Sequence, residues 1–456
     1  MMLTRSSRYL TLVVVFAFVA MLGMNAHVSA ADPVNLTISA GGNELKWITD
    51  TIKPAFEKKM ADAGTPVVVN PLDNSNITDA KQQIALDLKA GQGSDLFSFD
   101  GFWLPEFVDG GLIKPLDELV GPETADWEGW AQIPESIKTI LAYNGKTYGI
   151  PRGTDARVIW YNKDIIEKAG YDRDTFQPKS WAELLDAARK IKETSPDVTP
   201  FQLNAGTAMG EATTLQGYTM ALLGAGHHVY DFDQKKWIVS SPAILDTLNL
   251  YNTIYNTDGL GDTRWQLVKN GRDLSFQAFS QGKVGMLVEG DYLWRSILIP
   301  NGGDFAMADR DTKVGFAKMP AEEPGKGFRG QDFVTVSGGT GFIINPNTKA
   351  AKEAWALLTF MYSKDELTEL QKLEPRIRPR LDVPVVGDPV MSKMVTEVLP
   401  LTTIRPQLPS YSKVSEQIQL MTERVVSGEM TPQQAMDAYA KAVTEIVGAD
   451  NAITLN

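Results

Sequence analysis

The stretch Val34-Asn-Leu-Thr-Ile-Ser-Ala40, together with the residues that follow it, decides the fold of this chain. Residues 34–40 alternate between apolar and polar side chains, which predicts a strand with one buried face. Gly41-Gly42-Asn43-Glu44 ends this strand, and apolar residues at helical spacing then continue to Phe56. A strand, a polar loop and a helix in this order form the basic unit of an α/β sheet.

The same unit occurs twice more along the chain. A second strand, Val67–Val69, leads into a polar loop that contains Asn74, and a helix follows it. A third strand, Asp95–Phe99, ends at Asp100 just before Trp103. Three such units in succession predict an α/β lobe built on a largely parallel sheet.

Later segments mark two helix starts and one buried strand. Ser180-Trp-Ala-Glu183 has the pattern of a capping box, and Thr431-Pro432-Gln-Gln434 repeats it with proline at the first helical position. Residues 283–289 form a mostly apolar run that is typical of a buried strand. This strand ends just before Asp291, which is again a polar residue at a strand end.

The N-terminus predicts export. Arg5 and Arg8 precede the apolar run Leu10–Leu22, and small residues follow at 28–31, which is the pattern of a cleaved secretory signal. The apolar run is shorter than the roughly 20 residues that span a bilayer. We expect cleavage after Ala30. The chain has no cysteine to carry a lipid, so a periplasmic location is expected.

Composition excludes several classes of function. A formal net charge of −12 repels phosphate backbones, so nucleic acid is not an expected partner. The absence of cysteine removes thiolate nucleophiles and thiol-based zinc sites. Of the three histidines, His227 and His228 are adjacent and would point to opposite faces of a strand, which suits no metal site. No metal and no cofactor are expected.

Polar and aromatic residues gather at the predicted strand ends, where open α/β sheets bind their ligands. Carboxylates and amides can exchange hydrogen bonds with hydroxyl groups, and an aromatic ring can cover the apolar face of a pyranose. A mono- or oligosaccharide is therefore the expected ligand. The candidate residues in these loops are Asn43, Glu44, Asn74, Asp100, Trp103, Asp291, Tyr292 and Trp294.

Several segments, in order and spacing, resemble extracellular solute-binding proteins of ABC importers of the maltose-binding type. They are Asn144–Pro151 followed by Trp160–Asp164, Phe279–Met286, Gly338–Asn345 and Val426–Pro432. The resemblance covers nearly the whole chain after the signal. It implies a monomeric, non-enzymatic sugar-binding protein that delivers its ligand to the permease subunits of an ABC transporter in the inner membrane.

The resemblance also implies the two-lobed class II periplasmic-binding-protein fold, in which each lobe is a mixed sheet flanked by helices and the ligand is held in the cleft between the lobes. We expect residues 31–152 and 318–377 in the N-terminal lobe, and residues 153–317 and 378–456 in the C-terminal lobe. The three crossings between lobes are expected near Ile150–Thr154, Val314–Pro320 and Arg376–Pro384.

Six more candidate ligand-binding residues follow from this comparison. Asp155 and Arg157 lie just past the first expected crossing and would face the same side of an extended segment. Glycines 338 and 339 would let backbone N–H groups approach the ligand. The remaining two come from the third crossing and the C-terminal helical region. Together the six are Asp155, Arg157, Gly338, Gly339, Arg378 and Tyr411.

One feature departs from a site for a neutral sugar. Arg376, Arg378 and Arg380 place three guanidinium groups within five residues. We interpret this cluster as a solvent-exposed hinge surface. The alternative interpretation is a site for an anionic ligand such as glycerol phosphate or a uronate. Polyamine and ferric iron fit the composition less well. A carbohydrate-active hydrolase stays open, because 56 acidic residues could supply a catalytic carboxylate pair. Presentation of the ligand to a receptor is equally compatible with the sequence.

Overall fold

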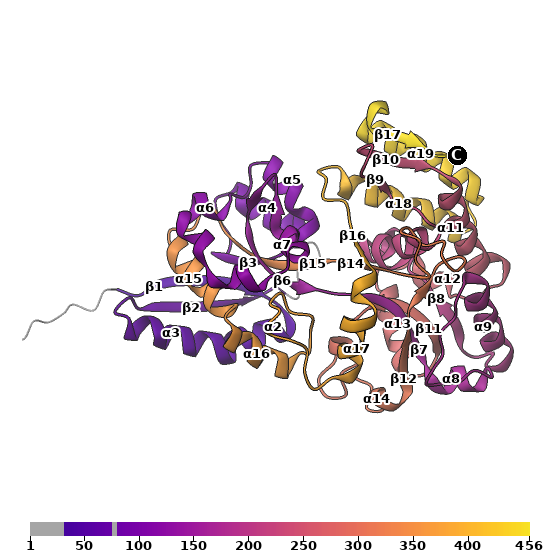
Figure 1. Cartoon of the computed structure of the whole chain (residues 1–456), viewed down its shortest axis with the longest axis horizontal. Helices are drawn as coiled ribbons and strands as arrows, with labels where there is room; N and C mark the ends of the chain where they lie inside the picture. Colours follow the sequence, from indigo (N-terminus) through magenta and orange to yellow (C-terminus); the bar gives the residue numbers. More distant parts are fainter. Residues whose placement is uncertain (1–31, 75–79) are drawn as a thin grey trace, which may run out of the picture.

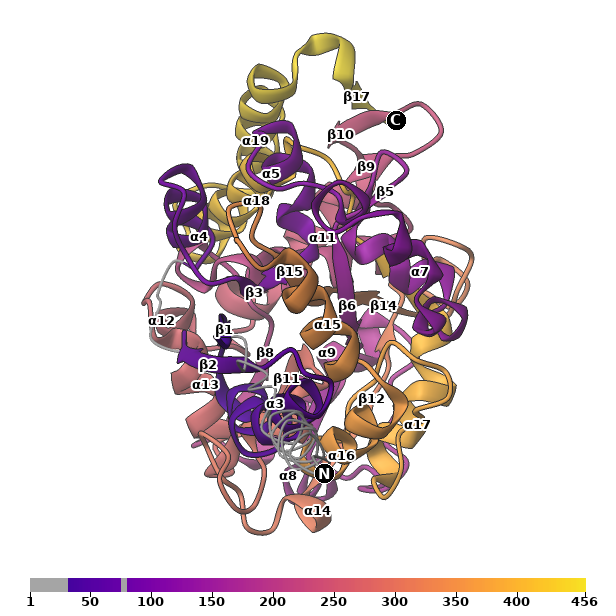
Figure 2. The same cartoon turned by 90° about the vertical axis from the view of Figure 1, so that its left-hand side faces the viewer.

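The computed structural model describes residues 32–74 and 80–456 as two lobes that lie side by side along the longest axis (Figure 1). Seen end-on in Figure 2, the first-lobe helices α3 (Lys53–Asp62), α15 (Ala351–Met361) and α16 (Lys364–Leu373) lie in front of the second lobe. The predicted export signal, residues 1–30, lies outside the described residues. Among the residues that are described, no helix has both the length and the apolar character needed to cross a membrane.

The first lobe is built on a five-stranded sheet in the order β2-β1-β3-β15-β6. Strand β1 (Val34–Ala40) pairs parallel with β2 and β3, and β15 pairs antiparallel with β3 and β6, so the sheet is mixed as expected. Leu36, Ile38 and Ala40 alternate into the core, which confirms the period-two pattern from which the strand was predicted.

Helices and short strands complete the first lobe around this sheet. The buried residues Trp47, Ile48, Ile52 and Phe56 all belong to its core, as the helical spacing predicts. The remaining first-lobe elements are α2 (Gly42–Trp47), β2 (Val67–Asp73), α4 (Ala80–Lys89), β3 (Leu96–Asp100), α5 (Leu104–Asp109), α6 (Leu116–Leu119), α7 (Glu135–Lys138), β4 (Ala142–Tyr143), β5 (Lys146–Thr147), β6 (Gly149–Thr154) and β15 (Gly339–Ile344).

The second lobe has a central four-stranded sheet in the order β12-β7-β11-β8. Strand β11 (Val284–Gly290) is buried along its whole length, because Met286 and Val288 enter one core cluster while Val284 and Leu287 enter another. A strand covered on both faces is expected to lack polar alternation. The apolar run that predicted this strand therefore has a direct physical cause.

Two smaller sheets and several helices surround the central one. The helix after Thr431 begins with the predicted capping box: the Thr431 hydroxyl accepts from the Gln434 N–H, and the Gln434 side chain accepts from the Thr431 N–H. The second-lobe elements other than β11 are β7 (Arg157–Asn162), α8 (Lys163–Lys168), α9 (Trp181–Thr194), β8 (Thr199–Gln202), α10 (Met220–Gly224), β9 (Tyr230–Asp231), β10 (Lys236–Ser240), α11 (Pro242–Asn252), α12 (Thr263–Gln266), α13 (Gly271–Ser280), α14 (Arg310–Lys313), β12 (Val314–Ala317), β13 (Met319–Pro320), β14 (Phe333–Ser337), α17 (Pro389–Glu397), β16 (Thr402–Ile404), α18 (Tyr411–Val426), α19 (Pro432–Val447) and β17 (Ala452–Thr454).

Three segments connect the lobes. The chain passes from β6 to β7 across Asp155 and Ala156, and it returns from β14 to β15 across Gly338. It leaves the first lobe a second time after α16 and reaches α17 through residues 374–388. We call these the first, second and third connecting segments.

The second connecting segment differs from the expected crossing at Val314–Pro320. Strand β12 pairs with β7 in the central sheet of the second lobe, and Met319, Val334 and Val336 pack in the core of that lobe. The chain has therefore not yet left the second lobe at residue 320. We propose that the lobe boundary falls at Gly338, about twenty residues later than the sequence indicated.

Candidate functional site

A polar cleft of about 560 Å³ lies at the connecting segments and takes residues from both lobes. Its volume falls within the range of small-molecule sites. Of the described residues that line it, six are arginines, six are acidic and one, Tyr292, is aromatic. The cleft meets the carboxyl ends of β1, β3 and β11, where an α/β sheet is expected to bind its ligand.

The first connecting segment forms the centre of the cleft. The side chain of Asp155 pairs with Arg157 and also accepts the N–H of Gly338 at 2.7 Å. Burial alone would raise the pKa of Asp155, but Arg157 and that N–H outweigh it and hold the pKa below its ordinary value. Asp155 is therefore a buried carboxylate fixed between the first and second connecting segments.

The first-lobe wall carries Glu44 and Arg152, which form an ion pair across the cleft edge of the sheet. Glu44 follows β1 and is buried, while Arg152 is in β6. Nearby, Asp100 at the end of β3 accepts from Arg405 at 3.0 Å. Burial raises the pKa of Asp100, and Arg405 only partly opposes this effect.

Arg405 joins the two lobes on one side of the cleft. Besides Asp100 of the first lobe, it donates to Glu211 of the second lobe at 2.9 Å. Tyr411 lies behind Glu211 and donates to it at 2.6 Å, while the aromatic ring of Phe102 packs against Tyr411 and under the guanidinium of Arg405. This cluster already bridges the lobes in the structure.

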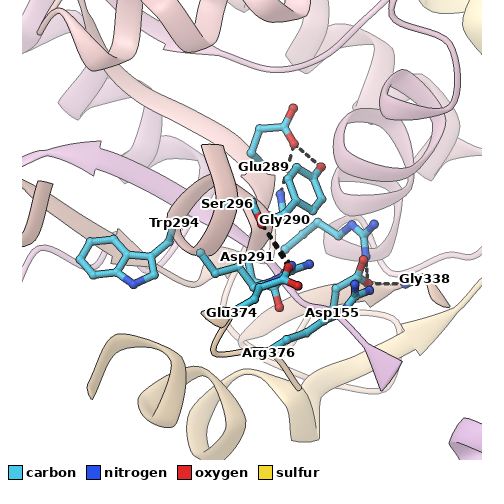
Figure 3. Close-up of polar contacts among 12 residues, drawn as sticks. Asp155, Glu289, Gly290, Asp291, Trp294, Ser296, Gly338, Glu374 and Arg376 are labelled. Carbon is cyan, nitrogen blue, oxygen red and sulfur yellow. Dashed lines mark hydrogen bonds and ion pairs between the residues drawn. The ribbon is translucent and has the colours of Figure 1, made fainter. Parts of the chain in front are cut away.

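The second-lobe wall depends on the buried carboxylate of Glu289 (labelled in Figure 3), which bonds to the cleft-lining residues Arg272 and Tyr292 and does not itself line the cleft. Arg272 donates to both oxygens of Glu289 at 2.9 Å, and Asn204 donates to it at 3.0 Å. Burial would raise the pKa of Glu289, but Arg272 overrides it and lowers the pKa. Arg272 and Gln216 both donate to the hydroxyl of Tyr292, and these bonds hold the Tyr292 ring at the cleft.

The third connecting segment closes the floor of the cleft. Glu374 pairs with Arg295 and accepts from Ser296 at 3.1 Å, and Arg295 also donates to Asp291 at 3.1 Å (Figure 3). Arg376 lines the cleft next to them, and its side-chain Nε and Nη1 are buried without a hydrogen-bond partner.

Eight of the predicted site residues line this cleft. They come from the strand-end loops of the first lobe, the first two connecting segments and the turn after β11. These residues are Asn43, Glu44, Asp100, Asp155, Arg157, Tyr292, Gly338 and Gly339.

Two aromatic candidates pack toward the cores of the lobes: Trp294 is buried, and Trp103 is partly buried against the first-lobe core. Trp103 packs edge-on against Phe99 in the first lobe, with ring centroids 5.3 Å apart. Trp294 stacks on Trp160 in the second lobe, and in Figure 3 it lies apart from the polar group around Asp155. Neither ring lines the cleft, which differs from the sequence-based expectation.

Four polar candidates take supporting or separate positions. Asn74 lines a different cavity, and its N–H donates to the Ala40 carbonyl. Asp291 is fully buried beneath Arg295, and Tyr411 acts on the cleft through Glu211. Arg378 faces an apolar groove outside the cleft, where its side chain donates to Gln371 and to the Glu374 carbonyl.

The preferred interpretation of the arginine cluster was wrong. Arg376, Arg378 and Arg380 are only 3–4 % exposed, so they do not form a solvent-exposed hinge surface. Arg380 bonds to Glu128 and Asp382, away from the cleft. Only Arg376 reaches the cleft, because the three side chains leave the segment in different directions.

Sequence reasoning did not single out most of the charged residues of the cleft. Arg152 lies within the predicted first crossing and Arg295 is one helical turn after Asp291, so their positions carried a usable signal. The others carry none, since a buried arginine looks like a surface arginine in a sequence. The missed lining residues include Arg152, Glu211, Gln216, Arg272, Arg295, Ser296, Asp304, Thr340, Glu374 and Arg405.

Chemically, the cleft offers many fixed donors and acceptors and little apolar surface. Guanidinium forks and carboxylates can bind adjacent hydroxyl groups, and each is held by a partner behind it. Within residues 32–74 and 80–456, no group of three histidine, aspartate or glutamate side chains has an arrangement suited to a metal ion. His228 instead sits in the core of the second lobe, where it contacts the Ile404 carbonyl.

Known proteins resemble this chain over most of its length. A family model described as "Bacterial extracellular solute-binding protein" matches residues 46–367. A binding protein of Brucella abortus is 28% identical over 429 residues, which cover 92% of this chain and 95% of the relative. The galactooligosaccharide-binding protein of Bacillus subtilis is 23% identical over 398 residues, or 85% of this chain and 83% of the relative.

A solved structure shows the same architecture. The solute-binding protein of an ABC transporter from Thermotoga lettingae, crystallised with α-D-tagatose, matches with a TM-score of 0.75 and 28% sequence identity. The match covers 91% of this chain and all of the other. The predicted two-lobed binding-protein fold is thereby confirmed.

Proposed function

The chain belongs to the bacterial extracellular solute-binding protein family, and from this premise we propose that it captures a carbohydrate or polyol for an ABC importer. Members of this family are binding proteins, so the chain is not the hydrolase that its acidic residues left open. The observation that carries the choice of ligand is the cleft itself. Its fixed carboxylates and guanidinium groups, on both lobes and on the first and third connecting segments, match a small molecule rich in hydroxyl groups.

Two kinds of relative support the carbohydrate assignment. The Bacillus subtilis relative is named for a galactooligosaccharide, and the Thermotoga lettingae structure contains a monosaccharide. In this chain, Tyr292 is the single aromatic ring among the described lining residues. A long oligosaccharide needs several rings on which its units can stack, so a ligand of one or two units suits this cleft better.

Capture would proceed by closure of the two lobes. Contacts made by one ligand to both lobes stabilise the closed arrangement over the open one and shift the population toward it. A micromolar affinity, about −8 kcal/mol, would allow both collection and release. The closed protein would then deliver its ligand to the permease subunits. The signal pattern at the N-terminus and the absence of cysteine favour a periplasmic location in this role, and the protein would act as a monomer.

Titration calorimetry on the purified protein would test the proposal, with a panel of neutral and acidic monosaccharides, disaccharides and polyols. We expect one compound to bind with a stoichiometry of one and to be recovered unchanged. Arg272→Ala should abolish this binding, because Arg272 fixes one wall of the cleft. Arg264→Ala is the matched control, since Arg264 is 87 % exposed and pairs only with Asp262. Repeated turnover of a glycoside would refute capture.

A further inference from the structure

Arg376 differs from the other described arginines of the cleft in its lack of a carboxylate partner. Each of the other five described arginines that line it is paired with at least one carboxylate: Arg152 with Glu44, Arg157 with Asp155, Arg272 with Glu289, Arg295 with Asp291 and Glu374, and Arg405 with Asp100 and Glu211. Arg376 is only 3 % exposed, and its Nε and Nη1 donate to no partner within residues 32–74 and 80–456.

The backbone of Arg376 is held firmly in place. Its N–H donates to the side chain of Gln371 at 2.9 Å, and its carbonyl accepts from the same side chain at 2.9 Å. Gln371 is itself buried in α16. The backbone that carries the guanidinium is therefore fixed at the floor of the cleft, and the side chain is buried there.

Positive charge exceeds negative charge around this group. Arg152, Arg295 and Arg378 surround Arg376, and with burial they hold its pKa well below the ordinary value. The carboxyl groups in the same region are Glu44 beside Arg152, Glu374 between Arg295 and Arg378, and Asp291 beneath Arg295. Asp155, which is paired with Arg157, also acts on Arg376. Among the described residues, five guanidinium groups thus face four carboxyl groups, which leaves an excess of one positive charge.

A buried charge without a partner is strongly unfavourable, and it is retained where a ligand supplies the opposite charge. A carboxylate matches an arginine fork in geometry, because its two oxygens can accept two parallel N–H bonds. It also brings a single negative charge, which equals the local excess. A phosphate monoester carries nearly two negative charges at neutral pH and would be repelled by Glu44 and Glu374.

We propose that the ligand of this cleft is a sugar acid, a uronate or an aldonate, whose carboxylate pairs with Arg376. The proposal rests on carbohydrate capture as the function of the cleft and names the class of carbohydrate. The hydroxyl groups of such a ligand would meet the remaining polar groups, among them Glu44, Asp155 and Gln216, which line the same cleft.

Calorimetric titration with matched pairs tests this assignment. The probes are D-glucuronate, D-galacturonate and D-gluconate, the neutral sugars D-glucose and D-galactose, and the phosphate esters glucose 6-phosphate and glycerol 3-phosphate. We expect at least one acid to bind at least tenfold more tightly than its neutral counterpart and than both phosphates. Binding of neutral sugars alone would overturn the inference and leave carbohydrate capture intact. Tighter binding of a phosphate would overturn the carboxylate. If no compound binds, both proposals fail.

Two variants of Arg376 separate charge from geometry. Arg376→Lys keeps the charge and should retain the preference for the acid with at least tenfold lower affinity, since lysine has no planar fork. Arg376→Gln should remove the preference for acid over neutral sugar. A preference unchanged in Arg376→Gln would show that another group binds the carboxylate and would overturn the assignment.

Unfolding of the protein without ligand gives an independent measurement. Because the buried guanidinium of Arg376 forms no ion pair with any described carboxylate, Arg376→Met should raise the urea midpoint of unfolding. Arg380→Met is the matched control from the same segment. It should lower the midpoint, since Arg380 is equally buried but bonds to Glu128 and Asp382. A midpoint that falls in both variants would mean that Arg376 has a structural role, and this would contradict the proposal.

Discussion

The carboxylate of Asp155 accepts the backbone N–H of Gly338 at 2.7 Å and so ties the first connecting segment to the second. The neighbouring Ser337 hydroxyl donates to the Asp155 carbonyl at 2.6 Å, which makes a second tie at the same point. Both segments also line the cleft. Asp155 therefore lines the cleft and also ties together two of the three segments that connect the lobes.

Asp155→Asn should destabilise the protein markedly. The amide can still accept from Gly338, but Arg157 would become a buried charge without its partner, which costs about 3–5 kcal/mol. Urea unfolding would measure the loss. Asp62→Asn is the control, because Asp62 and Lys58 form an exposed pair within one helix, worth less than about 0.5 kcal/mol. Equal effects in the two variants would contradict the structural role of Asp155.

Glu289→Gln should weaken ligand binding at least tenfold, although Glu289 is behind the cleft wall and does not line it. When Glu289 loses its charge, Arg272 loses the carboxylate that accepts from both ends of its guanidinium fork, and Tyr292 loses a carboxylate acceptor. Calorimetry with the best ligand would show the change. Glu167→Gln, which removes an exposed partner of Arg173, should leave the affinity unchanged. Unaltered affinity in Glu289→Gln would show that the wall tolerates a mobile Arg272.

Trp294→Ala should reduce stability and spare binding. Its ring stacks on Trp160 in a buried cluster and its indole N–H donates to Asp388 at 2.8 Å, so truncation leaves a cavity worth about 3–5 kcal/mol. Affinity measured well below the unfolding midpoint should change less than threefold. Trp294→Phe refills part of the cavity and should recover part of the stability. A large loss of affinity with intact stability would place this ring at the ligand after all.

The strands of the first lobe could be predicted because each has a local signal. Val34–Ala40 alternates, and its polar end at Asn43 and Glu44 meets the cleft as the position of strand ends requires. The second connecting segment was misplaced because β12 and β14 look like strands of either lobe. Only the pairing of β12 with β7 and of β14 with β16 assigns them to the second lobe, and pairing between segments so far apart in the chain leaves no local signal in the sequence.

The candidate site was predictable where a residue follows a strand directly, as for Asp100 and Tyr292. It was not predictable where the outcome depends on the direction in which a side chain points. The turn after β11 places Tyr292 in the cleft and Trp294 in the core, and the sequence does not reveal which side of that turn faces the ligand. Arg376 was flagged only as part of a cluster, since its burial depends on the packing of α16 against the third connecting segment.

Acid should weaken the fold through His228. This side chain is 1 % exposed, and burial lowers its pKa from 6.5 to about 4. Its Nδ1 accepts the Tyr230 N–H, so Nε2 carries the proton and donates to the Ile404 carbonyl, which satisfies the neutral ring. As the pH falls below 6.5, the unfolded chain binds a proton that the folded one does not.

The unfolding free energy should therefore decline by about 3 kcal/mol between pH 6.5 and pH 4 through this group alone. His228→Gln should be less stable than the native protein at pH 7, and the difference should shrink toward pH 4. His227→Gln is the control. Because His227 is only partly buried, this substitution should change the dependence of the unfolding free energy on pH much less. A pH profile that is parallel in the native protein and His228→Gln would contradict a neutral buried ring.

Gly153 allows the first and third connecting segments to touch. Its φ is +136°, and a Cβ at this position would lie 2.1 Å from the Ile377 carbonyl oxygen, next to Arg376. The adjacent Thr154 N–H donates to that same oxygen at 3.3 Å. No side chain fits here unless the third segment moves away.

Gly153→Ala should therefore lower stability by more than backbone strain alone and also weaken ligand binding, because the segment that must shift carries Arg376. Gly170→Ala separates the two effects: Gly170 also has a positive φ, +90°, but a Cβ there meets nothing within 4 Å. It should cost only the strain of that conformation, about 1–2 kcal/mol, with affinity unchanged. Unfolding and calorimetry on both variants measure the difference, and equal stability losses with equal affinities would mean that the contact between the two segments does not position the cleft floor.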